Sequence, residues 1–113
     1  MASFRRGQPG GSRLRARALD LPTMRLERRI LRLNDELARL RSQRELVSEE
    51  LRYHEHLNDD AQRDAAVSDA PIDRADARAT ADDVERFQRS VAALDARIER
   101  LTVKRDDLVS RLG

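Results

Sequence analysis

The sequence of 113 residues has no cysteine and no tryptophan, and its only aromatic residues are Phe4, Tyr53 and Phe87. Without cysteine, disulfides, thiolate zinc sites and cysteine nucleophiles are excluded. So few bulky side chains argue against a large globular core and against an enclosed substrate pocket. No apolar run approaches the roughly 20 residues of a membrane helix. The N-terminus also lacks the apolar segment of a signal peptide. We therefore expect a cytoplasmic protein without a membrane segment.

The sequence also lacks the motifs of common enzymes. It has no Ser/His/Asp arrangement, no glycine-rich phosphate loop and no dinucleotide fingerprint. His54 and His56 are two residues apart, so on a helix they do not share a face and cannot chelate a metal together. The sequence predicts a protein that is not an enzyme, with no catalytic residue, no metal site and no cofactor.

Two stretches, 26–61 and 77–112, instead repeat at alternating spacings of three and four residues, which is the pattern of a coiled-coil seam. The seam positions are Leu26, Ile30, Leu33, Leu37, Leu40, Arg44, Val47, Leu51, His54, Asn58 and Ala61 in the first stretch, and Ala77, Thr80, Val84, Phe87, Val91, Leu94, Ile98, Leu101, Arg105, Leu108 and Leu112 in the second. In an antiparallel pair, facing residue numbers have a constant sum. That register joins Leu26 with Leu112, Leu37 with Leu101 and Asn58 with Thr80.

The predicted fold class is all-α: an antiparallel two-helix coiled-coil hairpin, residues 22–113, with a disordered basic N-terminal tail, residues 1–21. The arms cover about residues 22–61 and 77–112, and the tip covers residues 62–76. Pro71 is the clearest break, because proline removes a backbone donor and disfavours helix at the residue before it. We expect Asp20 to cap the first helix ahead of Pro22, and Asp73 or Asp76 to cap the second.

Charge is unevenly distributed along the chain. Residues 1–20 contain five arginines and one aspartate, whereas residues 57–83 contain eight aspartates and three arginines. The tail arginines are Arg5, Arg6, Arg13, Arg15 and Arg17. They predict salt-dependent attraction to nucleic-acid phosphates. The alternatives are that the tail only keeps the chain soluble, or that Met24 is the true start.

The tip contains the candidate partner-binding residues Asp69, Asp73, Arg74, Ala75 and Asp76. Carboxylates on a projecting turn can coordinate a hard cation such as Mg²⁺. The alternative is that aspartate simply suits a soluble turn.

The segment from Asp69 to Ala75, followed by the acidic start of the second helix, resembles the coiled-coil tip of DksA-type transcription factors, and Gre transcript-cleavage factors share the general design. Asp73 and Ala75 match the second aspartate and the alanine of the family's tip motif, whereas its first aspartate falls on Ala70. The family's cysteine zinc finger has no counterpart in this sequence, and neither does the Gre docking domain. The resemblance implies a hairpin inserted into the secondary channel of RNA polymerase, with Asp73 near the catalytic Mg²⁺.

Two other functions stay open. Apolar residues off the seam could form a second face for a homodimer or an adaptor; these are Leu31, Leu46, Tyr53, Leu57, Val103 and Val109. The other function is that of a nucleic-acid or ribosome-associated protein that works through the arginine tail.

At the seam, we expect Arg44 and Arg105 to reach toward carboxylates of the opposite arm.

Overall fold

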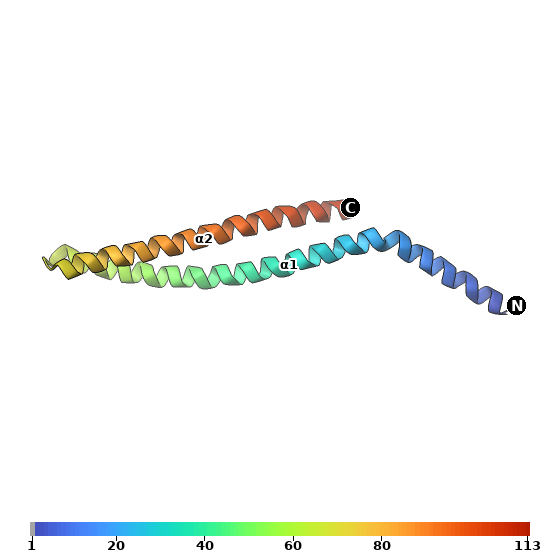
Figure 1. Ribbon diagram of the computed structural model, residues 1–113, viewed down its shortest axis with the longest axis horizontal. Coiled ribbons are helices and arrows are strands. Elements are labelled where there is room, and N and C mark those ends of the chain that lie inside the picture. The colour runs from blue at the N-terminus through green and yellow to red at the C-terminus, as the bar shows by residue number, and fades with distance from the viewer. Residues whose placement is uncertain (1) are drawn as a thin grey trace.

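The computed structural model describes the backbone of residues 2–113 and the side chains of residues 21–113. It consists of two helices, α1 (Ala2–Val67) and α2 (Pro71–Leu112), joined by residues 68–70. The helices run antiparallel and lie side by side, and the connection is at one end of an elongated molecule (Figure 1). The prediction of an all-α antiparallel hairpin is confirmed.

The start of α1 differs from the prediction. α1 begins at Ala2, so its N-terminal part continues past the end of α2 (Figure 1), and Pro22 stands within the helix rather than in its first turn. The expectation that Asp20 caps this helix is therefore wrong. The predicted flexibility of residues 1–21 falls mainly on residues whose side chains lie outside the described part of the chain, and it stays a prediction.

The seam between the helices follows the predicted heptad positions. Every seam position is buried or half-buried except Leu112, which is exposed beside the C-terminus. Side chains at these positions meet because a spacing of 3.5 residues keeps them on one side of each helix. The buried residues are Ile30, Leu33, Leu37, Leu40, Ala77 and Leu108. All but Ala77 lie toward the end opposite the turn, which we call the base of the hairpin. The apolar seam is therefore strongest at the base.

Contacts between the arms confirm the predicted register. The Thr80 hydroxyl donates a hydrogen bond to Asn58 Oδ1 at 3.1 Å, across the predicted pair. Near the base, Arg97 forms an ion pair with Glu36 at 2.6 Å. The rings of His54 and Phe87 stack with centroids 4.5 Å apart. His54 is thus a half-buried seam residue, as predicted.

The two seam arginines behave differently. Arg44 reaches Asp95 of the other arm through two hydrogen bonds, one from Nε and one from Nη2 at 3.2 Å. The Arg44 hydrogen bond lowers the pKa of the Asp95 carboxyl, and the same contact raises the pKa of Arg44. Arg105 departs from expectation, because its carboxylate partner is Asp106 of its own helix, and only Asn34 Oδ1 is reached across the seam, at 3.2 Å. Only the prediction for Arg44 is confirmed in full.

Candidate functional site: the turn and the basic end of the hairpin

The turn between the helices lies at the predicted break beside Pro71. Helix α1 continues to Val67 and α2 begins at Pro71, so only residues 68–70 of the predicted tip, 62–76, are non-helical. Pro71 suits the first turn of α2 because a backbone N–H there has no partner within the helix. The Ser68 hydroxyl accepts a hydrogen bond from the Ala70 amide at 3.1 Å. The predicted break is in the right place, and it is a compact turn.

The start of α2 has no side-chain cap. Its N-cap residue is Ala70, with φ −70° and ψ 129°, and no side chain accepts from the first amides. The expectation that Asp73 or Asp76 caps this helix is wrong, because both lie inside it. Asp73 is instead half-buried in the first turn, where its charge faces the positive end of the helix dipole, and its amide donates to the Ala70 carbonyl at 3.2 Å.

Of the predicted tip residues, the structure joins Asp69 and Arg74 by a hydrogen bond. Asp69 is exposed within the turn, Asp76 is exposed in α2, and Ala75 is half-buried. Arg74 is exposed, and its guanidinium donates to the Asp69 carbonyl oxygen at 3.3 Å, which fastens the turn to α2. Within residues 21–113, no group of three or more His, Cys, Asp or Glu side chains is placed to hold a metal ion.

The helices are also tied together just below the turn. Gln62 Nε2 donates to Asn58 Oδ1 at 3.2 Å and to the Ala77 carbonyl oxygen of α2 at 3.3 Å. Asn58 in turn accepts from Thr80. Sequence reasoning missed Gln62, although its place beside Ala61, which the register pairs with Ala77, was a usable signal. The seam near the turn has few large apolar side chains, and these hydrogen bonds hold the two helices together there. They therefore fix the orientation of the turn at the end of the rod.

No protein family, curated protein or solved structure matches this chain. The described part of the two helices contains no segment that is both long and apolar enough to cross a membrane.

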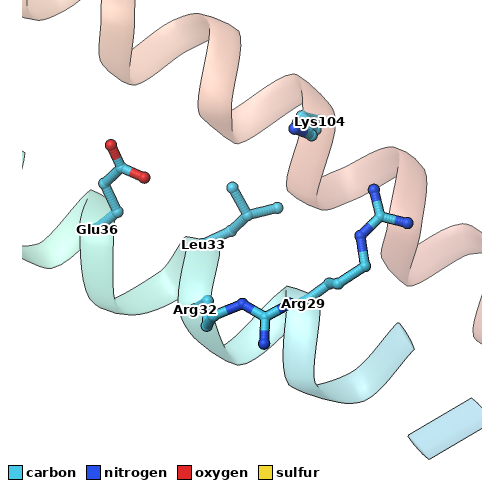
Figure 2. A pocket seen from close by; sticks show the side chains of 5 residues that line it. All are labelled: Arg29, Arg32, Leu33, Glu36 and Lys104. Carbon is cyan, nitrogen blue, oxygen red and sulfur yellow. The ribbon is translucent and has the colours of Figure 1, made fainter. Parts of the chain in front are cut away.

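The opposite end of the hairpin is basic. Figure 2 shows a hollow at the base, where Leu33 points from α1 into the space between the helices and Arg29 reaches toward α2. Arg29, Arg32, Leu33, Glu36 and Lys104 line this hollow, so both helices contribute cations to it. Arg25 and Arg28 extend the basic surface along α1.

Sequence reasoning did not single out the arginines of this region as a candidate site. The signal that it missed is the register, which places Lys104 on the same side of the hairpin as Arg29. The tail residues Arg5, Arg6, Arg13, Arg15 and Arg17 lie outside the described side chains, so the structure does not test their predicted attraction to phosphates.

Proposed function

We propose that this chain is a non-enzymatic, cytoplasmic interaction protein that presents an acidic tip to a large protein complex. The observation that carries the proposal is the construction of the tip. A three-residue turn is held in place by Ser68, Arg74 and Gln62, and it leaves the carboxylates of Asp69 and Asp76 exposed. A rigid arm with an exposed charged end suits insertion into a recess of a partner.

RNA polymerase is the most specific candidate partner, and a role as a transcription regulator follows from it. The support is the resemblance of residues 69–75 to the tips of DksA-type factors, together with a slender two-helix shape. The mechanism would be steric and electrostatic. The arms set the reach, and the carboxylates at the turn attract a basic or metal-containing site of the partner. No covalent chemistry is involved.

The decisive variants are at the exposed carboxylates. Asp73→Asn would remove charge from the first turn of α2 and so would mix partner binding with helix stability. The double variant Asp69→Asn/Asp76→Asn removes two exposed charges instead. Its matched control is Asp35→Asn/Glu49→Gln, which removes two exposed charges from the arm, where neither side chain has an ion-pair partner within residues 21–113.

The measurement is binding to purified RNA polymerase from the native cell, by co-sedimentation, together with the yield of promoter-directed transcription in its presence. We expect the tip variant to lose at least about tenfold in affinity, because charge-assisted contacts to a partner contribute about 1.5–3 kcal/mol each. The control variant should bind as the wild type does. If both variants bind equally, or the wild type does not bind the polymerase, the proposed tip function with this partner is wrong.

A second candidate is a dimeric structural adaptor without tip chemistry. Leu46 and Tyr53, which are 62% and 60% exposed, favour it because large apolar side chains so open to water often mark an interaction surface when they cluster. A third candidate, nucleic-acid binding through the arginine tail, gains some support from the basic hollow at the base.

A further inference from the structure

One row of residues along α1 changes its chemistry in order from the base to the turn. It consists of every seventh residue: Arg25, Arg32, Arg39, Leu46, Tyr53 and Asp60. A spacing of seven returns to nearly the same side of a helix, and all six side chains are exposed. We call this set the lateral row. It is basic at the base, apolar in the middle and acidic toward the turn.

Helix α2 continues the same pattern beside the lateral row. Arg29, one position from the seam, borders the same hollow as Arg32 and Lys104, so these cations of both helices share one side (Figure 2). The ion pair between Glu36 and Arg97 lies on this side as well. Continuing the register toward the turn places Asp76 and Asp83 of α2 on this side, next to Asp60.

The cations at the basic end of this face are mostly without partners of opposite sign, whereas at the acidic end Asp83 is paired with Arg86 of its own helix. Within residues 21–113, no carboxylate lies at ion-pair distance from Arg25, Arg32, Arg39 or Lys104. Asp60 has only Arg63 of its own helix, at 3.6 Å, and both side chains are more than two-thirds exposed. Such a pair contributes little and gives way easily to a better partner.

We propose that a second copy of this chain binds to this face with its long axis reversed. A reversed copy places the acidic end of one rod over the basic end of the other, and the apolar middles meet. A two-fold axis at Leu46 brings the two Leu46 side chains together and sets Arg32 opposite Asp60 of the second copy. Arg39 then faces Tyr53 of the second copy, a cation over an aromatic ring.

The size of the face is sufficient for such a dimer. Residues 25–67 of α1 extend about 63 Å at 1.5 Å per residue, and the strip is one to two helix diameters wide, roughly 10–20 Å. The contact therefore covers about 600–1,200 Å² per copy, against about 800 Å² per partner in a standard stable interface. The product is an antiparallel four-helix bundle with one turn at each end.

A second copy explains more of the face than a nucleic acid does. Phosphates would use the arginines and Lys104, but they would leave the exposed Leu46 and Tyr53 and the acidic end without a role. A reversed copy uses all three zones, in the order in which they occur. Asp76 belongs both to this face and to the tip, so the dimer is tested at Arg32, Leu46 and Asp60, which the tip variant leaves unchanged.

The first test measures the mass of the full chain by sedimentation equilibrium at low salt. We expect a dimer of two 13.0 kDa chains. Leu46→Asp places two like charges at the two-fold axis and should give a monomer. Leu31→Asp is the matched control, since Leu31 is as exposed as Leu46 (61% against 62%) but lies off the lateral row, so it should stay dimeric. Circular dichroism of both variants should show unchanged helix content.

The second test exchanges charges. Arg32→Asp and Asp60→Arg each put like charges opposite one another in the dimer, so each single variant should weaken it by at least about tenfold. The double variant Arg32→Asp/Asp60→Arg restores opposite charges within every pair and should recover the dimer. Raising the salt concentration should weaken the wild-type dimer.

Three results would overturn the proposal. The first is a wild type that stays monomeric at all accessible concentrations. The second is a double charge exchange that does not restore the dimer. The third is a monomeric wild type that retains single-stranded polyuridylate through Arg32 and Lys104, which would assign the basic end to nucleic-acid phosphates.

Discussion

Replacing Leu37 by alanine tests whether the heptad seam is what holds the hairpin together. Leu37 is fully buried, with 0% of its surface exposed, and the register sets it opposite Leu101. Removing the branched end of this side chain leaves a gap between the helices. The helices close this gap only in part, because the seam residues above and below it keep them apart. Substitutions of a buried leucine by alanine cost about 2–5 kcal/mol. A seam one layer deep can relax more than a globular core can, so we expect about 3 kcal/mol.

That loss is large for a molecule of this shape. Small domains with a single thin core rarely exceed about 3–5 kcal/mol of stability. At roughly 4–8 °C per kcal/mol, the melting temperature should fall by about 12–24 °C. The assay is urea and thermal unfolding followed by circular dichroism at 222 nm. All samples have the same protein concentration, because association makes the melting temperature concentration-dependent.

Leu31→Ala is the matched control. It makes the same chemical change on the same helix, at a side chain that is 61% exposed. Exposed substitutions usually stay within about 0.5 kcal/mol of the wild type. The losses of unfolding free energy in the two variants are then compared. If the loss for Leu37→Ala exceeds the loss for Leu31→Ala by less than about 1 kcal/mol, the arms are not packed along this seam, and the assignment of the core is refuted.

Two further substitutions test local contacts. The contact with Arg44 lowers the pKa of Asp95, so the stability that this contact contributes is present above about pH 4 and is lost as the pH falls through the folded-state pKa. Asp95→Asn should therefore lower the urea midpoint of unfolding at pH 7 and lower it less at pH 2. Equal losses at the two pH values would contradict this. Ala70→Asp supplies the missing N-cap of α2 and should raise the unfolding free energy by about 0.5–2 kcal/mol in urea titrations, whereas a loss of stability would show that the carboxylate cannot reach the first amides.

The arms were predictable because their formation depends on one simple requirement. A thin hairpin has one place to bury apolar side chains, so the spacing of Leu33, Leu37 and Leu40 identifies the seam without information on distant contacts. The register followed from matching the two patterns end to end. It needed no knowledge of the hydrogen bond between Asn58 and Thr80, which agrees with it.

The ends of the elements were less predictable, because local signals compete there. Asparagine and aspartate, as at positions 58–60, can bond their own backbone and so interrupt a helix, but the side chain of Asn58 accepts hydrogen bonds from Gln62 and Thr80 instead. Helix α1 continues to Val67, so only residues 68–70 of the tip are non-helical. Capping failed as a guide because Pro71 starts α2 without any side-chain acceptor.

The lateral row is present in the sequence, but its meaning depends on the register. A period of seven through Arg25, Leu46 and Asp60 could describe any solvated helix face. The hollow shared by Arg29, Arg32 and Lys104 shows that α2 adds the same sign of charge to the same end. Only then do the two helices together form a face that is polarised along its length.

Such a face carries a cost in a single hairpin, and that cost bears on its role. Arg29, Arg32 and Lys104 border one hollow, and none of the three has an ion-pair partner within residues 21–113. Their mutual repulsion opposes the packing of α1 on α2 at the base, where the apolar seam is strongest. Salt should therefore stabilise the isolated hairpin by screening this repulsion, while it weakens a dimer in which Asp60 of the second copy offsets the same charges. We therefore expect opposite effects of salt on the isolated hairpin and on the dimer, and a dimer that becomes tighter as salt is added would contradict the proposed pairing of charges.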